Sequence, residues 1–146
     1  MNPIHIALAE SDADIARCFP VMAQLRPHLV EAEFGPRVRR MQREGFLLAA
    51  LTAEGAVRAV AGYRYHEKLF SGRTLYVDDL VSDPGHRSRG HGARLLAWLA
   101  DQAKARDCDL LELDSGVQRF DAHRFYFRER MRIASYHFSR ALRAES

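Results

Sequence analysis

The sequence of 146 residues is poor in lysine, in cysteine and in long apolar runs. Lys68 and Lys104 are its only lysines, so nearly all of its 22 basic residues are arginine, whose planar guanidinium binds phosphate and carboxylate through paired hydrogen bonds. The formal net charge of +3 is too small to indicate nucleic-acid binding by itself. No apolar stretch approaches the roughly 20 residues of a membrane-spanning helix, and no leader pattern stands at the N-terminus. The composition therefore favours a cytoplasmic protein that binds neither membranes nor nucleic acid.

Cysteine usage points to a reduced protein without a metal site. Cys18 and Cys108 are far apart in the sequence, and neither belongs to a Cys-x-x-Cys pair or to a cluster with metal-ligand spacing. Isolated cysteines of this kind behave as small hydrophobic residues. The composition, 47% hydrophobic and 28% charged, is that of an ordinary globular domain. We therefore expect one domain over residues 1–146, which needs no disulfide or structural metal to fold.

Apolar periodicity and turn residues predict strands and helices that alternate around one sheet. Strands are expected at 4–9, 46–51, 57–65, 74–81, 110–114 and 133–139, and helices at 12–24, 29–44, 93–103 and 122–130. Pro20 is expected to kink or split the first helix, and Gly35-Pro36 to interrupt the second. The expected fold class is therefore a mixed α/β layer around a single sheet.

A glycine-rich turn at residues 87–92, RSRGHG, separates a predicted strand from a predicted helix. The first N–H groups of a helix lack internal partners, and the helix dipole favours an anion there. Gly90 and Gly92 let a phosphate approach the backbone, while Arg87 and Arg89 add positive charge. The turn lacks the Gly-Lys-Ser/Thr of a Walker loop and the third glycine of a dinucleotide fingerprint. It predicts a phosphate or pyrophosphate site, the alternative being a glycine-eased turn without a ligand.

The same turn matches the Arg/Gln-x-x-Gly-x-Gly/Ala pattern of the GNAT acetyltransferase superfamily. Residues 122–131, AHRFYFRERM, resemble that family's Ala-x-x-Phe-Tyr-x-x-x-Gly-Phe segment, and the order of elements resembles the family's over nearly the whole chain. The resemblance implies the GNAT fold, with a mostly antiparallel mixed sheet of about six to seven strands, about four helices, and a cofactor cleft between splayed strands 4 and 5. The sequence departs from the family at Arg130-Met131, where Gly-Phe is usual, and at Arg119, where many relatives carry Asn.

The resemblance implies an acetyl-CoA-dependent N-acetyltransferase, in which a primary amine attacks the thioester directly and no metal takes part. The pyrophosphate would lie on backbone N–H groups of the glycine-rich turn, and the pantetheine arm would pair like an extra strand with the strand before it. A backbone N–H of Leu80 or Val81 would polarise the thioester oxygen. The residues expected to bind the cofactor are Leu80, Val81, Ser82, Arg87, Ser88, Arg89, Gly90, His91, Gly92 and Ala93.

Four residues are candidates for the proton transfers. Tyr126 matches the tyrosine that often protonates the CoA sulfur in this family. Asp78 and Asp79 lie in an otherwise apolar strand, and Asp114 ends the next strand. Because neighbouring side chains of a strand face opposite ways, only one of Asp78 and Asp79 is expected to face the cleft, with Asp78 on the side of Leu80. Each of the three carboxylates is a candidate for the base or for contact with the amine.

Two alternatives to catalysis stay open. A non-catalytic CoA-binding sensor or interaction domain of the same fold would keep the phosphate site, but its tyrosine and carboxylates would not converge on the acetyl group. A nucleic-acid-binding domain lacks the basic cluster with interleaved aromatics that it requires. The sensor is the weaker of these two readings against catalysis because Tyr126, Asp78 and Asp114 are present, and the nucleic-acid reading ranks low because that cluster is missing.

The acceptor and the oligomeric state are not identified by the resemblance. A small amine, an amino acid, an aminoglycoside-like compound, and a protein lysine or N-terminus are all candidates. Acceptor pockets in the family are built largely by the first two helices and the strand 6–7 region, and acidic residues near the cleft favour a cationic acceptor. Because small members of the family often pair, a homodimer is one of the states to test.

Overall fold

The computed structural model describes residues 3–83, 85 and 89–143. The chain divides into two compact units, the first ending at Leu113 and the second beginning at Asp114. The first unit contains a sheet and three helices, and the second contains one helix. The predicted mixed α/β class is confirmed.

The sheet of the first unit holds five strands in the order β1-β2-β3-β4-β5. Neighbours are antiparallel from β1 to β4, and β5 runs parallel to β4. The strands are β1 (His5–Leu8), β2 (Leu47–Ala53), β3 (Ala56–Lys68), β4 (Gly72–Ser82) and β5 (Leu110–Leu113). The predicted mixed, mostly antiparallel sheet is therefore confirmed, with fewer strands than expected in the described part of the chain.

The strand expected at 133–139 is not formed in the structure. Its apolar alternation predicted a half-buried strand, but a strand also needs a partner for its backbone groups. Residues 131–140 have no regular secondary structure, and the side chains of Tyr136 and Phe138 are 85% and 92% exposed. This expectation was wrong because the alternation of apolar residues indicates which side chains of a strand could be buried, but not whether a neighbouring strand is present to pair with it.

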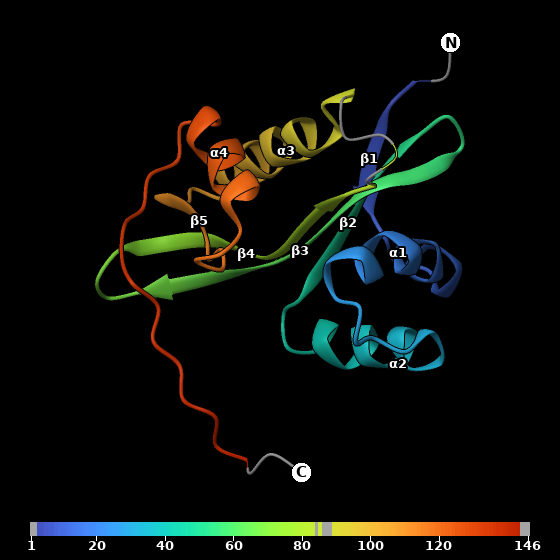
Figure 1. Cartoon of the computed structure of the whole chain (residues 1–146), viewed down its shortest axis with the longest axis horizontal. Coiled ribbons are helices and arrows are strands. Elements are labelled where there is room, and N and C mark those ends of the chain that lie inside the picture. The colour runs from blue at the N-terminus through green and yellow to red at the C-terminus, as the bar shows by residue number, and fades with distance from the viewer. Residues whose placement is uncertain (1–2, 84, 86–88, 144–146) are drawn as a thin grey trace. The chain divides into compact units, whose positions relative to one another are not determined.

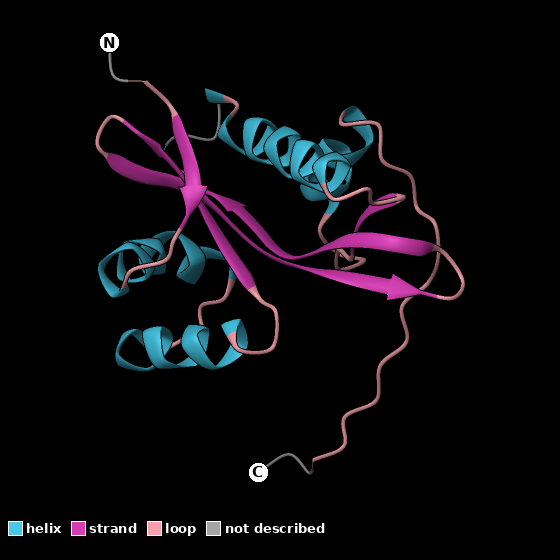
Figure 2. Ribbon diagram, turned by 180° about the vertical axis from the view of Figure 1, so that it is seen from behind, coloured by secondary structure: helices cyan, strands magenta, loops and turns pink. Residues whose placement is uncertain are grey.

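The four predicted helices are present as α1 (Asp12–Leu25), α2 (Glu31–Gln42), α3 (His91–Ala105) and α4 (Phe120–Arg128). Within the first unit, α1 and α2 lie against one face of the sheet and α3 against the other (Figures 1 and 2). Ser11 caps α1 as predicted, because its Oγ accepts a hydrogen bond of 3.0 Å from the N–H of Asp14.

Neither proline splits its helix. Pro20 lies inside α1 and Pro36 inside α2, whose single spans correct the expected interruptions. A proline in a helix costs about 3 kcal/mol, whereas each buried aliphatic side chain contributes about 1.5–3 kcal/mol. In α1, buried side chains flank Pro20 on both sides, for example Cys18 and Val21, so packing on the sheet outweighs the lost hydrogen bond.

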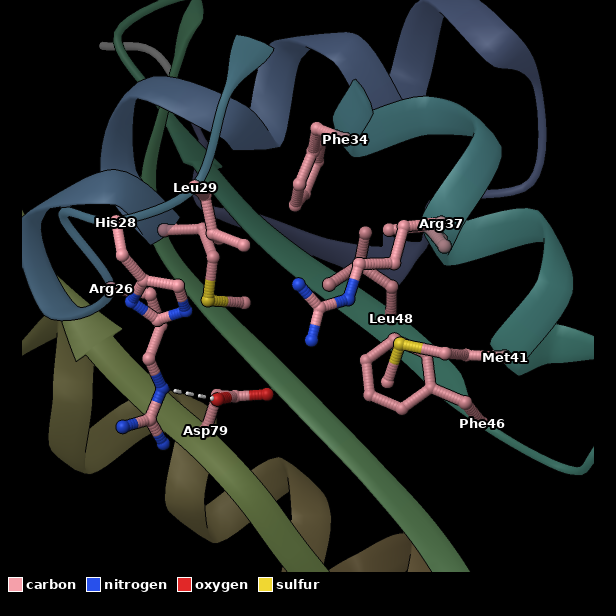
Figure 3. Close-up of a pocket in the computed structure, with 11 residues that line it drawn as sticks. Arg26, His28, Leu29, Phe34, Arg37, Met41, Phe46, Leu48 and Asp79 are labelled. Carbon is pink, nitrogen blue, oxygen red and sulfur yellow. Dashed lines mark hydrogen bonds and ion pairs between the residues drawn. The ribbon is translucent and has the colours of Figure 1, made fainter. Parts of the chain in front are cut away.

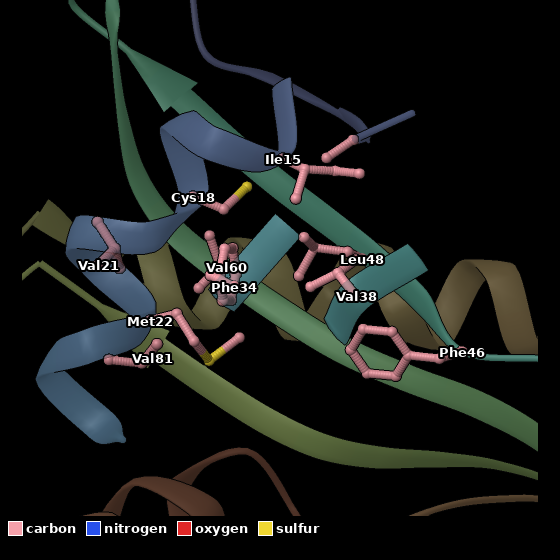
Figure 4. Close-up of a cluster of buried hydrophobic side chains, with 11 residues drawn as sticks. Ile15, Cys18, Val21, Met22, Phe34, Val38, Phe46, Leu48, Val60 and Val81 are labelled. Atoms are coloured by element: carbon pink, nitrogen blue, oxygen red, sulfur yellow. The ribbon is translucent and has the colours of Figure 1, made fainter. Parts of the chain in front are cut away.

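The core between the sheet and the first two helices is closed and apolar (Figure 4). Ile15 and Met22 of α1 and Phe34 of α2 pack on Val60 and other buried side chains of the sheet. Cys18 belongs to this cluster, and burial raises the pKa of its thiol to about 12. The thiol is therefore protonated and unreactive, as expected from the sequence.

Both cysteines are free, and in the described part of the chain no three His, Cys, Asp or Glu side chains gather as a metal site requires. Among the helices that the structure describes, none has both the length and the apolar character needed to cross a bilayer. On the other face of the sheet, Leu95 and Leu99 of α3 are fully buried, and Trp98 meets the Tyr63 ring edge-on at 6.3 Å.

A β-bulge interrupts β4 at Asp78. In the β3–β4 ladder Gly62 lies opposite Asp79, but the next pair is Tyr63 with Val77, so Asp78 is the extra residue. A bulge inverts the alternation of side chains on its two sides. The sequence could not reveal the bulge, because the extra residue is visible only in the pairing of β4 with β3.

The bulge also marks the point where β4 and β5 part. The parallel ladder pairs Thr74–Val77 with Leu110–Leu113 and ends there, whereas β3 continues to pair with β4 up to Ser82. From Asp78 onward, no described strand of the first unit pairs with the β5 side of β4. This open edge is the splay that the resemblance implied between strands 4 and 5.

Candidate active site

The open edge of β4 presents alternate peptide groups. The N–H of Asp83 donates a hydrogen bond of 2.7 Å to the carbonyl of Arg58 on β3. Because peptide groups alternate in direction along a strand, the N–H of Val81 also points to β3, whereas those of Leu80 and Ser82 point to the open edge. Of the two amides proposed to polarise the thioester, the geometry favours Leu80.

The N-terminus of α3 has the features of an anion site that its sequence predicted. Gly90 is the N-cap and adopts φ +74°, a left-handed conformation that glycine reaches without strain. Among the described residues, no side chain caps the helix and no acidic residue occupies its first turn, so none of them takes up its first N–H groups. A Cβ on Gly90 would meet no atom within 4 Å, which leaves room for a ligand. Arg87 and Ser88 lie outside the described residues.

Side chains around this helix start differ from the sequence expectation. Arg89 is paired with Glu54 of the β2–β3 turn, with 2.6 Å between Nη1 and Oε1. His91 is only 3% exposed, so its ring faces the interior. Gly92 and Ala93 follow it in the first turn of α3. Among the described residues, the helix start therefore offers an anion mainly backbone N–H groups, and the charge of Arg89 is partly neutralised by Glu54.

Asp78 and Asp79 are brought together, and each is paired with an arginine. Arg26, the C-cap of α1, donates from Nε to Oδ1 of Asp79 at 2.9 Å and from Nη2 to the Asp78 carbonyl at 3.1 Å. Arg64 of β3 holds the other carboxylate, with 2.8 Å between its Nη2 and Oδ2 of Asp78. The four residues form one network, in which positive and negative side chains alternate, on the sheet face that α1 and α2 cover.

This network corrects the expectation that only one of the two carboxylates faces the cleft. The bulge turns Asp78 to the same face as Asp79, because both pair with arginines on that face. For the same reason Asp78 does not share a face with Leu80, contrary to the prediction. Regular alternation would have separated the two carboxylates by the thickness of the sheet.

Asp79 is the titratable group of this network with a shifted pKa. Burial raises its pKa above the ordinary value of an aspartate, and the hydrogen bond from Arg26 opposes that shift. The carboxylate fits because Gly62 has no side chain: a Cβ there would lie 2.6 Å from Oδ2 of Asp79 and 2.6 Å from Cζ of Phe46. Sequence reasoning assigned no role to Gly62, and only the register of β3 against β4 identifies one.

A cavity of about 250 Å³ lies beside this network, between α1, α2 and the sheet (Figure 3). Most of its lining is apolar, with Met22, Phe34 and Leu48 among the contributors. Its charged or polar lining residues are Arg26, His28, Arg37 and Asp79. The cavity is bounded by the first two helices, which the resemblance associated with acceptor pockets, but the sequence did not identify the residues that line it. Those residues are distant in the sequence, and no local motif marks them.

The other two candidates belong to the second unit. Tyr126 lies in α4, where its ring meets that of Phe125 at 5.3 Å, and burial raises the pKa of its phenol above the ordinary value. Asp114 is half-exposed, and its Oδ2 lies 3.6 Å from Nδ1 of His137. The structure therefore joins Asp78 to Asp79, while Asp114 and Tyr126 are placed only within their own unit.

The end of α4 accommodates the departure from the family pattern. Arg130, at the position of the usual glycine, adopts φ +66°. Its N–H donates to the carbonyl of Phe127 at 3.1 Å, and the N–H of Met131 donates to the carbonyl of Tyr126 at 3.0 Å. These two bonds define a Schellman motif with Arg130 at the position that favours glycine. The turn expected from the family is thus formed in spite of the arginine.

Comparisons with known proteins agree with this architecture. Residues 12–131 match the Acetyltransferase (GNAT) family. A protein of Bacillus subtilis named uncharacterized N-acetyltransferase YhdJ is 35% identical over 124 residues, covering 84% of this chain and 87% of the relative. An aminoalkylphosphonate N-acetyltransferase of Salmonella typhimurium is 38% identical over 66 residues, which are 45% of this chain and 43% of that protein.

Among solved structures, an aminoglycoside N-acetyltransferase in complex with CoA superposes with a TM-score of 0.82. The superposition covers 99% of this chain and 97% of that one at 12% sequence identity, so it supports the fold alone. The family match and the Bacillus relative, by contrast, extend over most of this sequence. On these grounds the chain belongs to the GNAT family of acetyltransferases and is by class an N-acetyltransferase.

Proposed function

We propose that the chain transfers an acetyl group from acetyl-CoA to the amine of a small molecule. One observation carries this proposal: consecutive residues of β4 serve two different sites. Asp79 lines the cavity under α1 and α2, while Leu80 directs its N–H to the open edge of the strand. An amine in the cavity and a thioester on the edge would thus meet at adjacent residues.

The open edge fits the pantetheine arm of CoA. An unpaired strand edge binds a chain that carries amides, since each then satisfies the hydrogen bonds of the other. The free peptide groups of Leu80 and Ser82 supply this pairing, and the uncapped N-terminus of α3 supplies N–H groups for the diphosphate. Bound acetyl-CoA provides the thioester, and the Leu80 N–H stabilises the negative charge that develops on its oxygen.

Proton transfers complete the proposed reaction. The neutral amine nitrogen forms a bond to the carbonyl carbon, the carbon–sulfur bond breaks, and one proton leaves the nitrogen. Asp79 is the proposed acceptor of that proton, because its raised pKa makes it a better base than an ordinary aspartate. Tyr126, assigned by the family pattern, returns a proton to the sulfur. Its own raised pKa keeps the phenol protonated at neutral pH.

A small-molecule acceptor is proposed on two grounds. The cavity of about 250 Å³ is below the roughly 300–1,000 Å³ of pockets that hold drug-sized ligands. The Salmonella relative is named for transfer to an aminoalkylphosphonate, which is a small amine.

The proposal is tested by incubating the protein with acetyl-CoA and a panel of amines while free thiol is measured. Thiol release and a matching acetylated amine in the mass spectrum are the expected results. Asp79→Asn should lower kcat by about 10² or more, as loss of a general base does. Asp101→Asn, which alters an exposed carboxylate of α3, is the matched control. Tight CoA binding without release from any amine would favour a CoA-binding sensor instead.

A further inference from the structure

We propose that the cavity beside Asp79 selects amines that also carry an acidic group, and that Arg37 binds this group. The inference rests on the proposed function, because it names the acceptor class of the same site. The class is a compact amphoteric amine: a short, mostly apolar carbon body with an amino group at one end and a carboxylate or phosphonate at the other.

The charges around the cavity point to this class. Arg26 is committed to Asp79, and Arg64 to Asp78, so the two carboxylates already have cationic partners. Arg37 of α2 is different, because it forms no ion pair or side-chain hydrogen bond with any residue that the structure describes. Figure 3 shows its guanidinium directed into the middle of the cavity. Among the described residues of the lining, Arg37 is therefore the arginine that has no partner.

The orientation of an acceptor follows from where the chemistry takes place. Its amine must lie near Asp79, because the next residue, Leu80, faces the strand edge proposed for the thioester. Arg37 enters from α2, whereas Asp79 enters from β4, so the two charges stand on different walls of the cavity. A ligand with an amine at one end and an anion at the other complements both at once. Guanidinium binds carboxylate and phosphonate oxygens in a bidentate manner.

The remaining residues of the cavity lining determine which carbon skeleton an acceptor can have. Met22, Leu29, Phe34, Met41 and Leu48 contribute apolar surface to a cavity of about 250 Å³. Such a lining favours a few carbon atoms and disfavours a sugar ring crowded with hydroxyls. A polyamine or aminoglycoside would also place further positive charge against Arg37. The proposed acceptor thus adds an acidic group to the cationic amine that the sequence favoured.

Matched pairs of acceptors test the inference. 4-Aminobutanoate is compared with propylamine, which lacks only its carboxylate, and 3-aminopropylphosphonate with the same propylamine. In the wild type, kcat/KM for thiol release should be at least about tenfold higher for the acidic member of a pair, since hydrogen bonds to charged groups are worth that factor or more. The two pairs also separate carboxylate from phosphonate as the preferred anion, and either preference supports the class.

The variant Arg37→Ala should remove this advantage. Its kcat/KM for the acidic acceptor should fall about tenfold or more through KM, while that for the amine without the acidic group stays within about twofold. Arg40→Ala, on the same helix but outside the cavity lining, is the control and should preserve the preference. Equal losses for both members of a pair, or a wild type that prefers the amines without an acidic group, would overturn the inference and leave the proposed function standing.

Binding gives a readout that does not depend on turnover. Calorimetry with CoA present should detect the acidic member of a pair on the wild type and on Arg40→Ala, and much weaker binding on Arg37→Ala. If no amine of the panel releases thiol but this pattern of binding is seen, the acidic-ligand site stands and the proposed function fails. If the members of a pair with and without the acidic group bind alike, the inference is rejected whatever the turnover.

Discussion

Gly62 and Asp79 lie opposite each other in the β3–β4 ladder, and the missing side chain of the glycine makes room for the carboxylate of the aspartate. A Cβ at position 62 would also collide with the ring of Phe46, which lines the cavity. The glycine is thus required by packing, since its neighbours on both sides would have to move.

The first prediction concerns this contact. Gly62→Ala should lower the free energy of unfolding by about 1–3 kcal/mol, as overpacking of a close-packed site does. It should also lower kcat/KM, because the Asp79 carboxylate is displaced. Denaturant unfolding and thiol-release kinetics measure the two effects.

Gly35→Ala is the matched control. Gly35 lies in α2, and a Cβ there would meet no atom within 4 Å. Replacing a helical glycine by alanine should raise stability by about 0.5–1 kcal/mol. If both variants were equally stable and active, the role given to Gly62 would be wrong.

The second prediction concerns stability against pH. Burial raises the pKa of Asp79, so the folded state binds its proton more tightly than the unfolded state. This tighter proton binding stabilises the folded state. The stabilisation is fully present below the pKa of Asp79 in the unfolded state, near 3.9, and is lost as pH rises through its pKa in the folded state. Asp79→Asn cannot titrate, so the stability of the wild type relative to this variant should decrease from acid to neutral pH.

Denaturant titrations of both proteins at a series of pH values measure this difference. Arg26 loses its partner in Asp79→Asn, but its guanidinium stays charged throughout, so it adds a nearly constant offset. Asp101→Asn should give a difference that does not follow the same course. A wild type that gains stability over Asp79→Asn as pH rises would contradict the assigned direction.

The third prediction concerns Tyr126. Removal of the hydroxyl in Tyr126→Phe should lower kcat at least about tenfold, since general acids contribute about 10²–10⁴ to a rate, and should leave the affinity for CoA nearly unchanged. Tyr136→Phe removes a hydroxyl from a ring that is 85% exposed and should have no effect. Steady-state kinetics and CoA calorimetry of both variants make the comparison. Equal kcat values would exclude the phenol from the reaction.

Local features of this site were predictable from the sequence, and those that depend on pairing were not. The glycine-rich start of α3 was predicted, because a strand, two glycines and an apolar helical stripe are contiguous in the chain, whereas the positive φ of Gly90 is known only from the structure. The bulge at Asp78 was missed, because it exists only in the register between β3 and β4. The strand expected at 133–139 failed for the related reason that alternation does not supply a partner.

The charged lining of the cavity shows the same limit. Arg26, Arg37 and Asp79 are spread over more than fifty positions, and only Asp79 was a candidate from its own segment. The resemblance assigned acceptor pockets largely to the first two helices and the strand 6–7 region, and for this cavity that assignment stays a prediction. Which side chain is paired and which is uncommitted depends on contacts across the sheet, which local patterns do not encode.

The last prediction concerns the end of α4, where Arg130 occupies the left-handed position of a Schellman motif. In this left-handed conformation a residue with a side chain costs about 1–2 kcal/mol more than glycine. Part of that difference is offset, because glycine has a larger conformational entropy in the unfolded state and loses more of it on folding. Arg130→Gly should therefore stabilise the helix end by about 1 kcal/mol, whereas Arg130→Ala should not. Hydrogen exchange of the Met131 amide, which donates to the Tyr126 carbonyl, reports the change directly. Equal protection in the glycine and alanine variants would mean that the left-handed residue carries no strain, and the family's preference for glycine would then need a cause other than backbone conformation.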